Sequence, residues 1–237
     1  MNVTEELLAP VLAADPAGPR ITYYDDATGE RIELSAVTLA NWAAKTGNLL
    51  RDELGADAGS RVAVLLPAHW QTAAVLFGIW WIGAEVAWAD PAGADVAFCT
   101  ADRLAEADAA VGVGEVAVCS LDPFGKPVPD LPVGLTDYAT AVRAHGDRIV
   151  AAAAAGPALD GRSVADVVAA ARDSARDQGL GRADRVLSTL GWDGTDGLVD
   201  RLLAVFAAGA SLVQVANPDA AALQRRAATE KVTRTLS

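Results

Sequence analysis

The stretch Thr72–Ala89, TAAVLFGIWWIGAEVAWA, carries one charged side chain in eighteen residues. A helix that crosses a bilayer needs about 20 predominantly apolar residues, and the uninterrupted apolar part here covers only residues 72–84. Trp80 and Trp81 lie inside this run rather than at its edges, where tryptophans meet lipid headgroups, and no lysine or arginine flanks the run. We therefore expect a helix that is buried inside a water-soluble α/β domain.

Strand-like runs flank this helix on both sides. The preceding run, RVAVLLP (residues 61–67), is continuously aliphatic and ends in a proline, as is typical of a strand buried on both faces of a parallel sheet. The run EVAWA (residues 85–89) follows the helix after Gly83. Strand, apolar helix and strand form a βαβ unit, and a helix that is apolar on nearly every side needs a layer on each flank.

The alternation of strands and helices extends over the whole chain. ITYYDD and ERIELS (residues 21–35) read as a hairpin, after which Ser35 caps an amphipathic helix. Further strands are expected at residues 95–99, 115–120, 148–154, 185–190 and 211–216, and further helices from residue 101, over 136–145, 163–177 and 198–209, and from Pro218. This order predicts an α/β fold of mostly parallel sheets covered by helices.

One segment interrupts the pattern. The proline-rich connector LDPFGKPVPDLPVG, residues 121–134, is the best candidate for an internal boundary. We expect a single α/β domain over residues 1–237, with two lobes, residues 1–120 and 135–237, as the alternative organisation.

The charge of the chain excludes several classes of function. The formal net charge is −12, only three residues are lysines, and there is no run of basic residues. A nucleic-acid surface and attachment to anionic membranes are therefore not expected. The N-terminal segment MNVTEELLAPVLAADPAG carries two glutamates where a signal peptide would carry basic residues, so we expect a cytoplasmic protein.

The residues that bind transition metals are few and scattered. Cys99 and Cys119 each lie in a short apolar run, which predicts buried free thiols. His69 and His145 have no nucleophile or second ligand nearby in the sequence, and each reads as a helix-end or surface residue. No metal site is expected.

Two loops that follow strands are the candidate sites, because ligands of open parallel sheets bind at the carboxyl ends of strands. The loop AAGPALDGRS, Ala154–Ser163, has two glycines and an arginine, but Pro157 removes a backbone donor and Asp160 would repel a phosphate. The loop GWDGTDG, residues 191–197, has two aspartates that could hold a divalent cation, although a flexible connector is the favoured reading.

The text of the sequence resembles a known family. ITYYDDATGERIELS through LLP, the apolar helix and IGAEVAWADP resemble the opening of the adenylate-forming superfamily, the acyl- and aryl-CoA synthetases. Residues 179–215 are similar to the stretch after the phosphate loop of that family, and ATEKVT (residues 228–233) is similar to its REKVT. The resemblance covers nearly the whole chain and implies the fold of the N-terminal domain of these enzymes.

The departures from the family are concentrated at its substrate sites. The ATP-binding loop, TSGTTGxPKG, aligns with residues 154–163, where alanines and a proline replace most hydroxyl-bearing residues and an arginine stands for the lysine. The vestigial cofactor-binding candidates are Gly156, Gly161, Arg162 and Ser163. The loop at 191–197 aligns with the acyl-substrate region, which makes Trp192, Asp193 and Asp196 the substrate-binding candidates. We expect no cofactor, with vestigial ATP or AMP binding as the alternative.

In the family, segments that bind adenine, magnesium and ribose, and a C-terminal domain with a catalytic lysine, would follow Ser237. The resemblance therefore implies a truncated, degenerate relative without catalytic residues, which keeps the fold for binding or scaffolding. The alternatives are a module that binds a nucleotide or acyl ligand weakly and half of a ligase completed by a separate chain. Because relatives continue the sheet beyond this point, a homodimer or a protein partner is expected.

Overall fold

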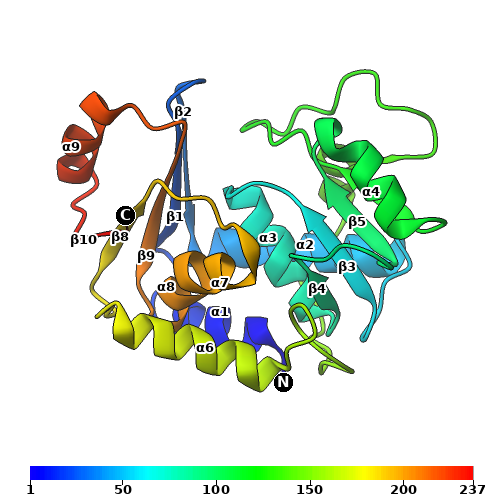
Figure 1. Cartoon of the computed structure of the whole chain (residues 1–237), viewed down its shortest axis with the longest axis horizontal. Coiled ribbons are helices and arrows are strands. Elements are labelled where there is room, and N and C mark those ends of the chain that lie inside the picture. Colours follow the sequence, from blue (N-terminus) through cyan, green and yellow to red (C-terminus); the bar gives the residue numbers. More distant parts are fainter. Residues whose placement is uncertain (237) are drawn as a thin grey trace.

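The computed structural model describes residues 1–236 and contains two five-stranded sheets with helices around and between them (Figure 1). The first sheet has the order β10-β8-β9-β1-β2 and the second the order β4-β3-β5-β6-β7. All strand pairs are parallel except the β1–β2 hairpin. The strands are β1 (Pro19–Asp25), β2 (Glu30–Ser35), β3 (Arg61–Leu65), β4 (Glu85–Ala87), β5 (Val96–Cys99), β6 (Glu115–Val118), β7 (Thr136–Asp137), β8 (Arg185–Ser188), β9 (Ser211–Ala216) and β10 (Arg234–Leu236). The expected α/β fold with mostly parallel, helix-covered sheets is confirmed.

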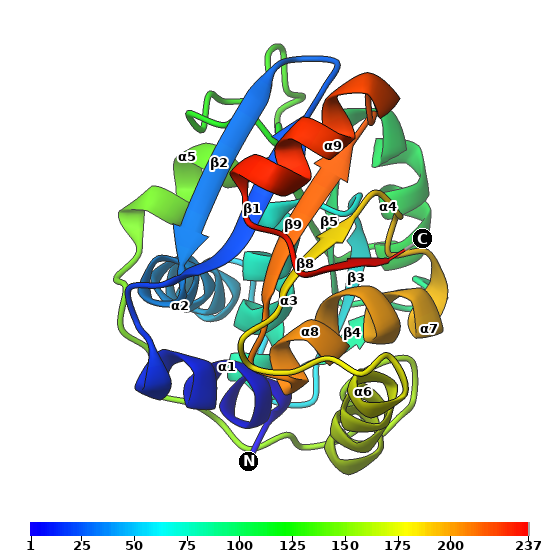
Figure 2. The same ribbon diagram turned by 90° about the vertical axis from the view of Figure 1, so that its left-hand side faces the viewer.

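The helices form three layers around the two sheets. The middle layer holds α1 (Val3–Ala14), α2 (Ala36–Asp52), α3 (Trp70–Trp81) and α8 (Ala204–Ala207), and its side chains share one core with the facing sides of both sheets (Figure 1). Helix α9 (Ala220–Thr229) packs on the outer face of the first sheet (Figure 2), and α4 (Leu104–Val111) on the outer face of the second. The chain is thus a five-layer αβαβα arrangement. Helix α6 (Val164–Asp177) packs against α1 and α8, and short helices α5 (Tyr138–Ala141) and α7 (Gly194–Leu198) complete the set.

Helix α3 is the buried helix that the opening stretch predicts. Every residue from Trp70 to Trp80 is buried. A side chain at Gly78 would place a Cβ atom 2.8 Å from the carbonyl oxygen of Ala43, so the glycine allows α2 and α3 to approach closely. The burial expected for the whole helix does not extend to Trp81, which is only partly buried. Within residues 1–236, no helix combines the length and the apolar character needed to cross a membrane.

Two expected elements are wrong. Residues 148–154 form no strand, because a run of alanines supplies none of the branched side chains that favour a pleated sheet, and the segment crosses the molecule as coil. It is held by hydrogen bonds such as Ala152 N to Trp81 O, 3.0 Å. The helix expected over 136–145 divides into β7, α5 and a 3-10 turn, since Asp137 ends the strand and caps the helix through Thr140 N.

Two further elements were not expected. Helix α1 begins at a capping box in which Asn2 and Glu5 bond each other's backbone amides. The short strand β10 extends the first sheet beside β8. The first sheet combines the N-terminal hairpin with strands that come after residue 134, on the far side of the proline-rich connector.

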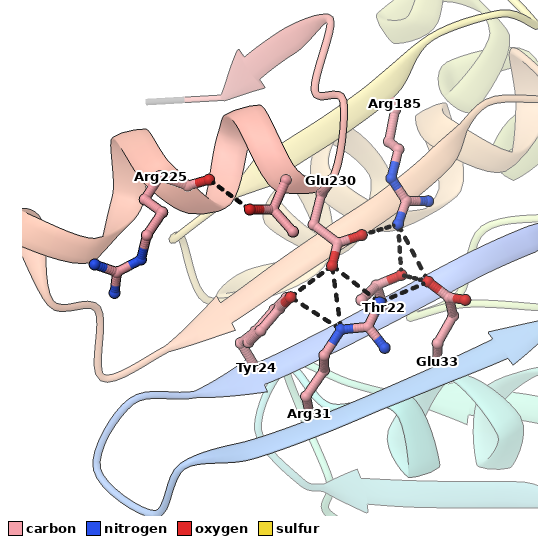
Figure 3. A network of polar contacts seen from close by, with 8 residues as sticks. Thr22, Tyr24, Arg31, Glu33, Arg185, Arg225 and Glu230 are labelled. Carbon is pink, nitrogen blue, oxygen red and sulfur yellow. Dashed lines mark hydrogen bonds and ion pairs between the residues drawn. The ribbon is translucent and has the colours of Figure 1, made fainter.

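A polar network joins α9 to the first sheet (Figure 3). Glu230, at the end of α9, accepts hydrogen bonds from Tyr24 Oη (2.5 Å) and Arg31 Nη2 (2.9 Å), and it also pairs with Arg185. Burial would raise the pKa of Glu230, but the hydrogen bonds from Tyr24, Arg185 and Arg31 outweigh it and lower the pKa to about 2. The glutamate of the ATEKVT segment is therefore a structural residue that fixes α9.

Candidate functional site

The fold brings the two candidate loops together. Arg162 Nη2 lies 3.0 Å from Asp196 Oδ1, and Thr195 Oγ1 donates to Asp160 Oδ2 at 2.5 Å. The contact lies where β4 and β8 end, since the chain leaves β4 at Trp88 and leaves β8 shortly before Trp192. The carboxyl ends of parallel strands are the usual place for a ligand in this type of fold.

The loop at residues 154–163 is a tight turn that is built into the sheet. Leu159 forms a parallel bridge with Val86 of β4, and Arg162 N donates back to Leu159 O at 2.8 Å. The turn places Asp160 at φ 44° and Gly161 at φ 80°, in the left-handed region. Ala158, which the sequence resemblance aligns with a hydroxyl-bearing position, is buried, and its carbonyl accepts a hydrogen bond from Trp80 Nε1 at 2.8 Å.

The carboxylate of Asp160 occupies the centre of the site. Its Oδ1 accepts hydrogen bonds from the backbone amides of Trp88 (2.8 Å) and Ala89 (3.1 Å), and its Oδ2 accepts from Thr195. Backbone amides and hydroxyls are the donors that a phosphate would need. In this chain these donors already serve an anion that belongs to the protein.

The other cofactor-binding candidates are engaged in structure or exposed. The Ser163 hydroxyl caps α6 by accepting from Asp166 N at 3.2 Å and donates to the Asp166 carboxylate. Gly161 N donates to Glu85 Oε1 at 2.8 Å. Gly156 is exposed, with open space where a side chain would be. The loop therefore offers few free donors to a ligand.

The substrate-binding candidates divide into one core residue and two surface residues. Trp192 is buried, donates to Gln214 Oε1 at 3.1 Å, and accepts at its carbonyl from Trp88 Nε1. The side chains of Asp193 and Asp196 are 89% and 81% exposed. Within residues 1–236, no group of three or more His, Cys, Asp or Glu side chains is placed to hold a metal ion.

Sequence reasoning missed a second feature of this edge. A groove of about 960 Å³ opens where β1, β3, β6 and β9 end, between the β1–β2 hairpin and the segment Ser120–Phe124. His69 and Glu30 line it. His69 does cap α3, as a helix-end residue, but it is buried rather than exposed. The place of His69 just after a strand, in LLPAH, is a signal that could have identified it, whereas Glu30 is the first residue of β2 and has no such signal.

Comparison with known proteins identifies relatives of two kinds. A protein of Mycobacterium tuberculosis (strain ATCC 25618 / H37Rv), named TIGR03089 family protein, is 71% identical over 234 residues, which cover 97% of this chain and 96% of the relative. No protein-family model matches the chain.

Among solved structures, an acyl-CoA synthetase of Brucella canis matches with a TM-score of 0.80 at 19% identity, covering 99% of this chain and 47% of its own. A benzoate CoA ligase of Burkholderia xenovorans LB400 (TM-score 0.75, 17% identity) covers 99% of this chain and 50% of its own, and the N-terminal domain of FACL13 from Mycobacterium tuberculosis (TM-score 0.71, 18% identity) covers 99% and 62%. The chain thus spans about half the length of the two synthetases. The expected likeness to the N-terminal domain of acyl-CoA synthetases is confirmed at the level of the fold.

Proposed function

The chain belongs to the TIGR03089 protein family, and on this premise we propose that it is a non-catalytic protein that keeps the acyl-CoA-synthetase fold for binding or scaffolding. The name of the family states no activity, so the proposal depends on the chemistry of the site. We propose a cytoplasmic location for it.

The observation that carries the proposal is the position of the Asp160 carboxylate. It accepts hydrogen bonds from two backbone amides and from Thr195, so a phosphate would have to displace it or lie beside it. Two anions a few ångströms apart repel each other, and a displaced carboxylate would lose its charge-assisted bonds.

The cation of the loop does not offset this repulsion. Arg162 lies 3.0 Å from Asp196, so its charge is already paired, although the pair is solvent-exposed. Transfer of an acyl carboxylate to the α-phosphate of ATP develops negative charge that needs preorganised donors or cations. The described loop supports binding of neither the phosphates nor this transition state.

The test is pyrophosphate exchange with MgATP and a panel of fatty and aromatic acids, with an active acyl-CoA synthetase assayed in parallel. We expect exchange at background for the wild-type chain and for Arg162→Ala. An acid-dependent signal that Arg162→Ala abolishes would show that this loop works in catalysis, and a signal that survives the substitution would show a different active site. Either signal overturns the proposal.

The expected homodimer or protein partner stays a prediction. Light scattering at micromolar concentration gives the mass of the species in solution, and a native pull-down identifies partners. A monomer without a partner in both measurements would contradict it.

A further inference from the structure

The groove at the ends of β1, β3, β6 and β9 contains a buried acid next to a buried imidazole. The side chains of His69 and Glu30 are 2% and 9% exposed. Neither residue takes part in the contact between the two loops. Since an ionised carboxylate loses much solvation free energy on burial, its surroundings show what it is placed to bind.

One hydrogen bond of the His69 ring fixes the position of its proton. Nδ1 accepts from the backbone amide of Gln71 at 3.1 Å, so a neutral imidazole carries its proton on Nε2. Nε2 lies 3.7 Å from Glu30 Oε1, and the ring of Tyr23 packs edge-on against the imidazole with 4.3 Å between centroids. Burial lowers the pKa of His69, which favours the neutral ring. A neutral His69 therefore places no positive charge beside the Glu30 carboxylate.

Glu30 has an unfilled bonding capacity. Among residues 1–236, Oε1 has no hydrogen-bond partner. The arginine that also lines the groove, Arg31, is committed to Tyr24, Glu33 and Glu230. Oε1 itself has less than 1 Å² of accessible surface, so a cationic group that reaches the carboxylate from the groove would stabilise it through its charge rather than through a bond to Oε1.

The rest of the groove combines negative charge with an apolar surface. Asp25 and Asp122 line it as well, and the side chain of Phe124, with 80% of the residue exposed, lies at its edge. Asp25 accepts from Asn217 Nδ2 at 2.9 Å, and Asp122 accepts from backbone amides, so both carboxylates are held in place. Such a lining repels phosphates and carboxylates and attracts cations with an apolar body.

We propose that this groove binds a small amine-bearing molecule, with its ammonium group at the Glu30 carboxylate and its apolar part against Phe124. The volume of about 960 Å³ is within the range of small-molecule sites. The inference rests on the proposed function, because it names the ligand class of a protein that binds rather than adenylates.

The experiment is a titration of the full chain with phenethylammonium chloride, 2-phenylethanol and 3-phenylpropionate, followed by calorimetry and ligand-observed NMR. We expect the ammonium compound to bind at least about tenfold more tightly than the neutral alcohol, and the carboxylate not to bind. Glu30→Gln should weaken binding of the ammonium compound by about tenfold, and Phe124→Ala should weaken it severalfold while leaving methylammonium unaffected. Glu115→Gln, which removes an exposed carboxylate at the other end of β6, is the matched control and should change nothing.

Three results would overturn the proposal. The first is no binding of the ammonium compound at concentrations up to about 10 mM. The second is binding by Glu30→Gln as tight as by the wild type, with an unchanged circular dichroism spectrum, and the third is tighter binding of the carboxylate than of the ammonium compound. Failure of the proposed function would appear instead as pyrophosphate exchange, which this titration does not measure. The two failures are therefore distinguishable.

Discussion

Replacement of Asp160 tests whether the loop at residues 154–163 is a structural element. Asp160→Ala removes three hydrogen bonds, to Trp88 N, Ala89 N and Thr195 Oγ1, and leaves an alanine at φ 44°. Because the side chain is only partly buried, we take about 2 kcal/mol for the three bonds together and about 1 kcal/mol for the left-handed backbone. The expected loss in the free energy of unfolding is about 3 kcal/mol, or a drop in Tm of roughly 6–12 °C for a domain of this size.

Two further substitutions at the same position separate these contributions. Asp160→Asn keeps one acceptor oxygen and tolerates positive φ, so the free energy of unfolding should fall by about 1 kcal/mol. Asp160→Gly loses the three hydrogen bonds but adopts the left-handed backbone without strain, so the free energy of unfolding should fall by about 2 kcal/mol. Asp130→Ala is the control, since Asp130 has φ 53° but lies exposed in a turn, and it should cost no more than about 1 kcal/mol. Urea unfolding at pH 7 gives the free energy of unfolding of all four variants. The reasoning is refuted if Asp160→Ala lies within about 0.5 kcal/mol of the wild type or is more stable than Asp160→Gly.

Three other predictions follow from buried groups. Trp80→Ala should cost about 3–5 kcal/mol in urea unfolding and Trp81→Ala less than half of that, because only the first is fully buried; equal losses would contradict the packing of α3. The pKa of Glu230 is lowered to about 2, so its contribution of about 2 kcal/mol is present above pH 4.5 and lost as pH falls toward 2. Glu230→Gln should therefore be less stable than the wild type at pH 7 and should lose less stability when the pH is lowered. If its free energy of unfolding fell with pH as steeply as that of the wild type, the result would count against the network. Burial raises the pKa of Cys99 to about 11 and holds the pKa of Cys119 well above its usual value, so both thiols should react with a thiol reagent only in urea; rapid reaction of the native protein would contradict their placement.

The strands and helices were predictable where the sequence carries its own pattern. The apolar composition of β3 and α3 predicts that both are buried. Ser35 and Ser163 indicate where two helices begin, because serine is a common N-cap residue. The alanine run at 148–154 misled the prediction because alanine is compatible with coil, helix and strand.

The candidate site was predictable only in part. The positions of both loops after strands, and the chemistry that they lack, can be read from the sequence. The bonds of Asp160 to Trp88 N and Ala89 N join segments more than 70 residues apart, so no local pattern shows them. The same holds for Glu30 and His69, which meet because β1 and β3 end at the same edge of the molecule.

The pairing of β1 with β9 has a consequence for synthesis on the ribosome. Ile21 is paired with Leu212, whereas every strand of the second sheet lies within residues 61–137. The second sheet can therefore form while translation continues, but the N-terminal hairpin must wait for almost the whole chain before its partner strand emerges. During that interval the apolar side of the hairpin is exposed to solvent or to a chaperone. Slow closure of this long-range pair, rather than formation of any helix, is the step that should limit the rate of folding.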